Sequence, residues 1–306
     1  MLACSETNFS DCDTRVRLPG RRVSRRVVTS AMTIPYPRIS PEILRVGPIA
    51  IRWYGVMYLV GYAVGIRIAK RRVRRGVVPF DERAVDSLVV YLFVGMLVGA
   101  RLVYVFLYDR AAYAAHPLEA FAVWRGGLSF HGAVLGMVTA CFIFAQRRHL
   151  PFWTVADTLA LSGTPGLFFG RLGNFINAEL YGRPSHVAWA MVFPTDPLHL
   201  PRHPSQLYEA VCEGLVLFLL LRTLERRALR EGWYWPGLLT GVFLIGYGIV
   251  RFALEFTRQP DAQLGFVLGA FSMGQLLSSA MIVAGVVVLV WTVPTRAARS
   301  PEVPAR

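Results

Sequence analysis

The sequence predicts an all-α polytopic membrane protein with seven transmembrane helices and a small folded cap outside the lipid. Composition is the first reason: of 306 residues, 54% are hydrophobic and only 17% are charged, and the mean hydropathy is +0.44. Such an apolar excess is too large for a soluble domain of this length. The other two reasons are seven separate apolar stretches and an uneven distribution of arginine between the loops that join them.

The first 31 residues do not resemble a signal peptide. They carry six arginines and three acidic residues and contain no long apolar core. We interpret 1–31 as a basic extension that is either disordered or precedes a start of translation at Met32. The transmembrane domain is expected at 32–295, followed by a tail at 296–306.

The apolar stretches are each about 16–25 residues long, which suits a helix that crosses a bilayer. A backbone inside lipid must satisfy its own hydrogen bonds, and these stretches lack the alternation of a barrel strand, so helices are expected. We expect them at 49–69, 84–108, 128–146, 153–172, 206–221, 236–256 and 273–293.

The loops predict the orientation in the membrane. Those after the first, third and fifth segments contain runs of basic residues, at 70–75, 147–148 and 222–230, whereas the alternate loops contain fewer. By the positive-inside rule the first set is cytoplasmic, so the N-terminus lies outside and the C-terminus inside. The formal net charge of +14 therefore suits an anionic lipid surface better than nucleic acid.

The longest outside connection, at about 173–205, is expected to form the cap. It contains five prolines together with Tyr181, Trp189 and Phe193. Turns fixed by proline and combined with aromatic residues are typical of a folded element resting on the membrane interface.

Polar residues inside the apolar segments mark the candidate site, because an ionisable group is costly in lipid. Tyr247, Arg251 and Glu255 recur at a spacing of four, so a helix places a phenol, a cation and a carboxylate on one face. Either this row is a self-satisfied ion pair with a tyrosine near the interface, or it binds a ligand.

Arg171 and Asn174 are three residues apart at the outer end of the fourth segment. The planar guanidinium of arginine suits a phosphate group, and asparagine can donate to an ester or phosphate oxygen. Gly170 and Gly173 beside them allow close approach either by a ligand or by a neighbouring helix.

His131 and Tyr54 lie near the outer ends of their segments. A lone histidine is more often a hydrogen-bonded structural group than a catalyst, although a neutral imidazole at membrane depth can accept a proton. Tyr54 is either a ligand contact or part of the aromatic belt. Together the residues predict a site for an anionic headgroup, without a metal or cofactor, since no compact set of ligands is present and the four cysteines have no ligand spacing.

Six blocks in order resemble the phosphatidylglycerol:prolipoprotein diacylglyceryl transferase family over about 34–293. They are IRWYGVMYLVGY (51–62), WRGGLSFHGAVLG (124–136), GRLGNFINAELYGRP (170–184), RHPSQLYEA (202–210), LIGYGIVRFALEFTRQPDAQLG (244–265) and SMGQLLS (272–278).

The resemblance implies a multi-pass enzyme of the bacterial inner membrane with its active site towards the periplasm. Such an enzyme moves diacylglyceryl from phosphatidylglycerol to the lipobox cysteine in the signal peptide of a preprolipoprotein. The reaction forms a thioether and releases glycerol phosphate. The partners implied are these two substrates and membrane lipids.

The resemblance also assigns residues. It places the essential histidine and arginines at His131, Arg171 and Arg251. The substrate-binding residues it implies are Tyr54, Asn174, Glu179, Gly182, Tyr247 and Glu255. Ala178 stands where a glycine is common in the family, and 166–170 is bulkier than usual, which leaves acyl-chain preference open.

Two other classes of protein would also place arginines in a membrane. An anion transporter needs them along its path, and a lipid-binding scaffold needs them for a headgroup but has no need of His131. Transport without lipid turnover would indicate the first class, and insensitivity to substitution at His131 would indicate the second.

Overall fold

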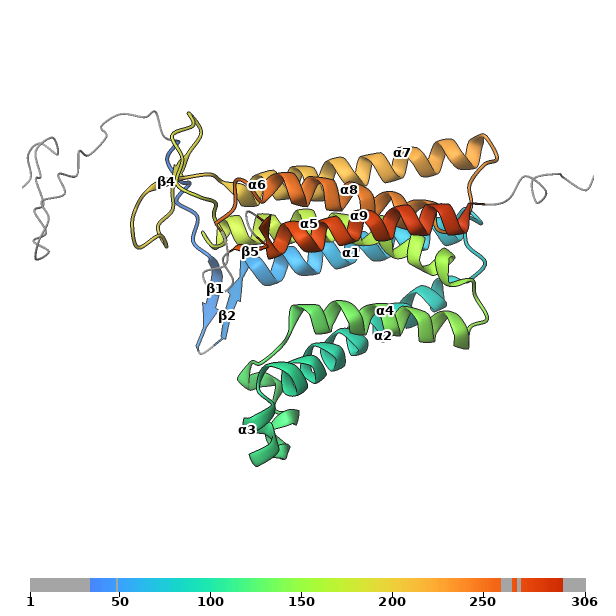
Figure 1. Ribbon diagram of the computed structural model, residues 1–306, viewed down its shortest axis with the longest axis horizontal. Coiled ribbons are helices and arrows are strands. Elements are labelled where there is room, and N and C mark those ends of the chain that lie inside the picture. The colour runs from blue at the N-terminus through green and yellow to red at the C-terminus, as the bar shows by residue number, and fades with distance from the viewer. Residues whose placement is uncertain (1–33, 48, 260–265, 269–270, 294–306) are drawn as a thin grey trace, which may run out of the picture.

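A computed structural model describes residues 34–47, 49–259, 266–268 and 271–293. The expected extension at 1–31 and the expected tail at 296–306 lie outside the described residues. The described chain is mostly helical (Figure 1).

Strands occur near both ends of the described chain and within the connection after α5, and helices make up most of the rest. In chain order the elements are β1 (Glu42–Val46), β2 (Ile49–Arg52), α1 (Trp53–Arg74), α2 (Glu82–Val103), a π-helical turn (Tyr104–Tyr108), α3 (Arg110–Ala115), 3₁₀ turns (Pro117–Phe121 and Val123–Arg125), α4 (Phe130–Arg147), α5 (Phe152–Ile176), β3 (Met191–Val192), β4 (Pro201–Arg202), α6 (Ser205–Glu209), a π-helical stretch (Ala210–Val216), α7 (Leu217–Arg230), α8 (Leu238–Leu254), β5 (Phe266–Leu268), β6 (Phe271–Ser272) and α9 (Met273–Thr292).

Each of the seven expected segments overlaps a long helical stretch of the described chain, with α6, the π-helical stretch and α7 forming one continuous rod. Among the described residues, three helices are long and apolar enough to cross a membrane, and the shorter α8 is also apolar. The chain is therefore a helical membrane protein. The three qualifying stretches are Glu82–Tyr108, Phe130–Arg147 and Met273–Thr292.

The expectation of a purely helical chain was wrong in one respect, because the described residues also contain three two-stranded antiparallel sheets. Residues 49–52 form β2, paired with β1, so the first helix begins at Trp53 rather than at 49. Gly47 supplies the left-handed backbone (φ +59°) that the turn between β1 and β2 requires. Figure 1 places β1, β2, β4 and β5 at one end of the helices.

The helices form two groups (Figure 1). One is a bundle of α1, α5, α8, α9 and the α6–α7 rod; the other is the α2–α4 pair, which leads to α3 at its far end. The closest pairs are α1 with α5, α2 with α4, and α8 with α9. Between α2 and α4 the backbones nearly touch: a Cβ atom added at Gly136 would lie 2.0 Å from the carbonyl oxygen of Gly95.

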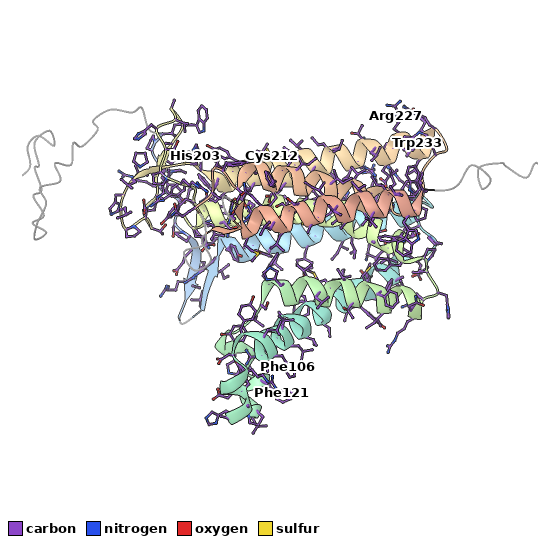
Figure 2. All side chains as sticks on the ribbon, viewed as in Figure 1. Phe106, Phe121, His203, Cys212, Arg227 and Trp233 are labelled. Carbon is purple, nitrogen blue, oxygen red and sulfur yellow. The ribbon has the colours of Figure 1, made fainter. Side chains whose placement is uncertain are left out.

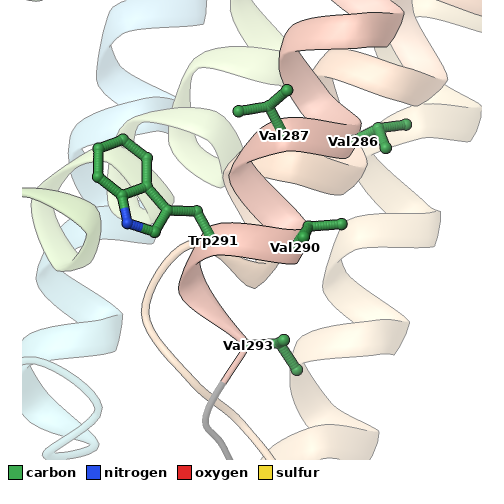
Figure 3. Close-up of a pocket in the computed structure, with 5 residues that line it drawn as sticks. All are labelled: Val286, Val287, Val290, Trp291 and Val293. Carbon is green, nitrogen blue, oxygen red and sulfur yellow. The ribbon is translucent and has the colours of Figure 1, made fainter.

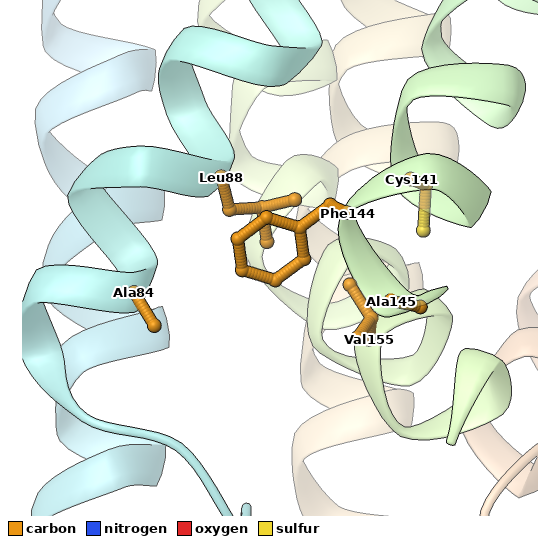
Figure 4. Packing of buried hydrophobic residues seen from close by; sticks show 6 residues of the cluster. All are labelled: Ala84, Leu88, Cys141, Phe144, Ala145 and Val155. Atoms are coloured by element: carbon orange, nitrogen blue, oxygen red, sulfur yellow. The ribbon is translucent and has the colours of Figure 1, made fainter. Parts of the chain in front are cut away.

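A compact core joins the α2–α4 pair to the start of α5. Its buried members are small or aliphatic residues around one phenylalanine (Figure 4), and they include Phe144 and Val155, both fully buried. Because this core uses α5 of the bundle, it fixes the α2–α4 pair against the bundle at one end. The complete set is Ala84, Leu88, Cys141, Phe144, Ala145 and Val155.

A buried polar network joins α1, α5, α7 and the loop between α7 and α8 at the end of the bundle remote from the sheets. Arg72 of α1 donates to Glu225 of α7 at 2.6 Å and to Thr158 of α5 at 2.6 Å. Tyr234 hydrogen-bonds both Arg72, at 2.9 Å, and Asp157, at 2.8 Å. Every charge in this network has an opposite charge or hydrogen-bond partner, as a buried charge requires. Figure 2 places Arg227 and Trp233 at this end and His203 and Cys212 towards the other.

The connection between α5 and α6 is folded, and we call 177–204 the cap. It begins later than the expected residue 173, because the hydrogen bonds of α5 continue to Ile176. Its core gathers Ala178, Met191 and Phe193, against which Tyr36 and Tyr181 pack. The cap is therefore a packed unit at the end of α5.

One ion pair holds the cap together. Arg202 donates twice to Asp196, through Nε at 2.6 Å and Nη2 at 3.0 Å, and both side chains are buried. The amides of Leu198 and Leu200 donate to the same carboxylate. These hydrogen bonds, those from Arg202 above all, hold the pKa of Asp196 below its ordinary value.

The Asp196–Arg202 pair predicts an acid-sensitive cap. Because the folded-state pKa is depressed, the stabilisation is complete above the ordinary aspartate pKa and is lost as the pH falls through the lowered folded value. Asp196→Asn should lower the opening free energy of the cap at neutral pH by roughly 3 kcal/mol and weaken its dependence on acid. Hydrogen exchange at the amides of Leu198 and Leu200 measures both effects.

The matched control is Asp86→Asn. Asp86 pairs with Lys70 at 2.7 Å, but its side chain is 57% exposed. An exposed pair contributes about 0–1 kcal/mol, so this change should leave the cap amides unaffected. Equal exchange in the two variants would contradict the role given to the Asp196–Arg202 pair.

Candidate active site

A cluster of three arginines and three glutamates lies where α5, the α6–α7 rod and α8 meet near the cap. Arg171 comes from the last two turns of α5, and Arg251 from the last turn of α8. We call the group the charged cluster. Its members are Arg171, Glu209, Glu213, Arg251, Glu255 and Arg258.

Glu209, at the end of α6, is the centre of the charged cluster. Its Oε2 lies 2.7 Å from Nη2 of Arg171 and 3.8 Å from Nη1 of Arg251. Its Oε1 accepts a hydrogen bond from Arg258 at 2.5 Å. A fully buried carboxylate thus contacts all three guanidinium groups and offsets their mutual repulsion.

Glu255 holds the other side of Arg251. Its Oε2 lies 3.2 Å from Nη2 of Arg251, one helical turn away, and 3.6 Å from Nε of Arg258. Its Oε1 accepts from the Ser272 hydroxyl at 3.0 Å, at the start of α9. The predicted pairing along α8 is thus present, and α9 contributes to it.

Glu213 lies in the π-helical stretch, four residues after Glu209. Its nearest cationic nitrogens are Nη2 of Arg171 at 3.9 Å and Nη1 of Arg251 at 4.0 Å. The next residue explains this position: a Cβ atom at Gly214 would lie 2.5–2.7 Å from Phe168 atoms. The rod can therefore come close to α5 and bring Glu213 beside Arg171.

Formal charge balances in the cluster, with three cations and three anions. Glu209 and Glu213 are 0% exposed, whereas the side chains of Arg171, Arg251 and Arg258 are 21%, 17% and 15% exposed. The carboxylates are therefore buried more deeply than the arginine side chains, which form the more accessible side of the cluster. This arrangement can present N–H donors to an anion.

A second polar group adjoins the end of α5. Asn174 donates to Oε1 of Glu179 at 2.8 Å, and Asn177 donates to the same oxygen at 3.3 Å. Tyr54, at the start of α1, shares a hydrogen bond of 3.0 Å with Tyr58. Residue 173, beside Asn174, is a glycine, and a Cβ atom there would lie 3.0 Å from the Tyr54 ring. The missing side chain therefore allows α1 to pack close to α5.

Gly182 links the cap to the charged cluster. It forms an antiparallel bridge with Arg258, and its N–H donates to the carbonyl of His203 at 2.9 Å. A Cβ atom there would lie 2.3 Å from the carbonyl oxygen of Thr257. Only glycine fits this approach, which sets where Arg258 enters the cluster.

Tyr247 lies one turn before Arg251 on α8, close enough to Glu213 and Arg251 to interact with their charges. Its ring stacks on that of Phe243 with centroids 5.8 Å apart. Tyr247 is therefore at the edge of the charged cluster, on the helical face that the sequence predicted.

His131 stands apart from this group. It is the second residue of α4, it is exposed, and its ring meets that of Phe130 at 5.8 Å. None of the hydrogen bonds and ion pairs between described residues joins it to the charged cluster. The structure thus brings Arg171, Arg251 and Glu255 together but does not bring His131 into contact with them.

Sequence reasoning missed Glu209, Glu213 and Arg258 as members of the site. A signal for the two glutamates was available, because two carboxylates four residues apart in an apolar segment share one helical face and need a cation. Arg258 gave a weaker signal: it lies three residues after Glu255, with which it pairs at 3.6 Å, but it follows the end of α8, where helical spacing no longer applies.

The backbone is strained at Ala178, where the family resemblance implies a glycine. Its backbone is left-handed (φ +54°), a conformation that glycine adopts readily and alanine does not. The position immediately precedes Glu179, which Asn174 and Asn177 contact. The alanine therefore adds strain next to the site without removing a polar group.

Within the described part of the chain, no three histidine, cysteine, aspartate or glutamate side chains gather as a metal site.

A hollow of about 570 Å³ lies on α9, but at the end of the helix opposite Ser272 (Figure 3). Its apolar lining carries no charge and does not belong to the site. The lining residues are Val286, Val287, Val290, Trp291 and Val293.

Comparison with known proteins shows similarity to one family. Residues 41–291 match the family described as prolipoprotein diacylglyceryl transferase. Relatives named phosphatidylglycerol–prolipoprotein diacylglyceryl transferase include one from Rhodospirillum rubrum, 50% identical over 262 residues, covering 84% of this chain and 93% of the relative. Another from Bordetella parapertussis is 47% identical over 253 residues, covering 82% and 95%. A third, from Pseudomonas putida, is 45% identical over 262 residues, covering 84% and 96%.

Gly182→Ala tests the link between the cap and the cluster. The added methyl group would meet the backbone of Thr257, so the bridge to Arg258 must open, at a cost of about 1–3 kcal/mol or more. We expect a lower midpoint of thermal unfolding in detergent. The matched control is Gly163→Ala on α5, where an added Cβ atom meets nothing within 4 Å. If both variants unfold like the wild type, the close approach at Gly182 is not required.

Proposed function

The chain belongs to the prolipoprotein diacylglyceryl transferase family, and we propose that it transfers the diacylglyceryl group of phosphatidylglycerol to preprolipoproteins. The acceptor is the lipobox cysteine thiol in the signal peptide, the product is a thioether, and glycerol phosphate leaves. The chain is then a transferase that acts in the first step of lipoprotein maturation. The family match over 41–291 supports this assignment more directly than any single residue does.

The proposed setting is a bacterial inner membrane that the seven long helical stretches cross, with the N-terminus outside and the C-terminus inside. The ends of α1, α4 and α7, which carry the basic loops, lie at the end of the molecule remote from the cap (Figure 1). With those loops in the cytoplasm, the cap and the charged cluster face the periplasm. Membrane lipids would surround the exposed apolar side chains of the helices.

The donor lipid is proposed to bind with its phosphate at Arg171 and Arg251. The observation that carries this proposal is that two arginines from different helices share one buried carboxylate, that of Glu209. A shared counter-ion holds two guanidinium groups close together with N–H donors still accessible, an arrangement suited to a phosphodiester. Glu255 would then orient Arg251, from which it lies 3.2 Å away.

The other residues proposed to bind substrate lie on α1, at the end of α5, in the cap and on α8. Asn174, Tyr54 and Tyr247 offer donors for the glycerol and ester oxygens of the lipid. Glu179 orients Asn174 through their hydrogen bond of 2.8 Å. Gly182 has an indirect role, because its bridge to Arg258 determines where the chain after α8 approaches the charged cluster.

The reaction is a displacement at carbon. The thiol loses its proton, the sulfur forms a bond to the terminal carbon of the diacylglyceryl group, and the bond from that carbon to the phosphate oxygen breaks. Negative charge grows on the departing phosphate, where the guanidinium groups stabilise it. Phosphate is already the leaving group, so the proposed step needs no metal or cofactor.

His131 is the proposed base for the thiol, with an orienting or lipid-binding role as the alternative. It lies on α4, outside the charged cluster. A base on a separate helix is compatible with a peptide thiol that enters between α4 and the bundle. The comparisons do not favour the transporter and scaffold hypotheses, because the relatives are named as transferases.

The function is tested by incubating the purified protein with phosphatidylglycerol and a lipobox peptide. Mass spectrometry should show one diacylglyceryl group added to the cysteine through a bond that resists thioester cleavage. Replacing the cysteine of the peptide by serine should abolish the shift. If the folded protein produces no mass shift in the peptide, the proposed function is wrong.

The same assay separates the roles of His131 and Arg171. His131→Gln should lower turnover about 10²-fold or more if it removes a base. Arg171→Lys keeps the positive charge but loses the planar guanidinium group, and should mainly raise the KM for phosphatidylglycerol. Full turnover by His131→Gln would show that the base is another group.

A further inference from the structure

Glu213 is the buried charge that the proposed chemistry leaves without a role. The residue is 0% exposed, and neither of its carboxylate oxygens has a hydrogen-bond partner among the described residues. Its two closest cations, Arg171 and Arg251, are 3.9 and 4.0 Å away. A buried carboxylate without hydrogen bonds is unfavourable, so such a group either takes up a proton or has another function.

The other two glutamates of the cluster differ from Glu213. Glu209 has guanidinium nitrogens at 2.5 and 2.7 Å, and Glu255 accepts from Ser272 at 3.0 Å. Their negative charges are held by close partners, whereas that of Glu213 is not. Glu213 is therefore the carboxylate that takes a proton at the smallest cost.

The net charge of the cluster indicates when Glu213 should take up a proton. Three arginines and three ionised glutamates sum to zero without a ligand, and a phosphodiester adds one negative charge. The nitrogens of Arg171 and Arg251 nearest to Glu213 belong to the guanidinium groups proposed to bind the phosphate. A bound phosphate would thus place a second anion beside Glu213 in a low-dielectric setting, which favours protonation of the carboxylate.

We propose that Glu213 takes up a proton when the anionic phosphate of the donor lipid binds and releases it when the phosphate leaves the site. The inference rests on the function proposed above and deepens it by naming the carboxylate that offsets the charge of the bound phosphate. Glu213 would be a positioning residue, because it is fully buried and acts on the phosphate through the guanidinium groups of Arg171 and Arg251.

The atoms and charges balance in this step. The thiolate forms the carbon–sulfur bond, and the electron pair of the broken carbon–oxygen bond stays on the phosphate oxygen. Glycerol phosphate leaves as a dianion, and Glu213 then gives its proton back to solvent and becomes a carboxylate again. The thiol proton has gone separately to the base.

The titration of Glu213 depends on the groups that face it. Arg171 faces it from α5, Tyr247 and Arg251 from α8, and Arg258 from the chain after α8. Glu209 and Cys212 lie on its own rod. Of these groups, Glu209 has the closest cationic partners, with Arg171 at 2.7 Å and Arg258 at 2.5 Å.

The test is calorimetric titration of the full-length protein in detergent with short-chain phosphatidylglycerol. Two buffers of different ionisation enthalpy at about pH 8.5 report the protons taken up per lipid bound. We expect the wild type to take up close to one proton and Glu213→Gln to take up none while still binding the lipid. Glu231→Gln is the matched control, since Glu231 lies at the opposite end of the rod in an exposed ion pair; it should behave like the wild type.

Turnover gives a second readout that a structural role would not produce. In the wild type, KM for the lipid should rise about tenfold per pH unit once Glu213 is ionised in the free enzyme, because binding then requires a proton; Glu213→Gln should remove this rise. Glu213→Asp, which keeps a carboxyl group, should restore proton uptake and the dependence of KM on pH.

The outcomes separate the two proposals. Lipid binding by the wild type without proton uptake overturns the inference and leaves the proposed function intact, and this measurement needs no variant to fold. Uptake that persists in Glu213→Gln assigns the proton to another group and also overturns it. Absence of lipid binding by the wild type overturns the donor site itself, and the inference with it.

Discussion

Everything at the candidate site depends on Glu209, a fully buried carboxylate that contacts three arginines. A charge within a membrane-embedded bundle is costly unless it is paired, and removing one partner of a buried pair leaves the other uncompensated. Arg171, Arg251 and Arg258 come from different parts of the chain, and Glu209 is the side chain that all three contact. Its position at the end of α6 therefore determines where accessible guanidinium groups can face an anion.

The helix packing serves this arrangement. Close approach at Gly214 brings the rod against α5, and close approach at Gly182 brings the chain after α8 against the cap. At the opposite end of the bundle, Arg72 and Glu225 join the same rod to α1 through another buried pair. The rod is thus fixed at both ends, which allows its carboxylates to position the arginines.

The sequence predicted what depends on local periodicity. The seven apolar segments correspond to long helices, and the pairing of Arg251 with Glu255 follows from their spacing on one helix. It did not predict the hairpin at 42–52 or the later start of the cap, because turns and helix ends depend on a few local hydrogen bonds. Arg258 was missed because it follows the end of α8, where helical spacing no longer applies. The roles assigned to His131, Arg171 and the substrate-binding residues remain predictions from the family resemblance.

The most direct measurement of the central claim is a structure of the protein with phosphatidylglycerol bound. The claim is that Glu209 holds Arg171 and Arg251 so that both bind one phosphate. Phosphate oxygens should then lie about 2.7–3.2 Å from nitrogens of both guanidinium groups, with Glu209 still paired to Arg171. A phosphate bound elsewhere, with both arginines still occupied only by glutamates, would contradict the account.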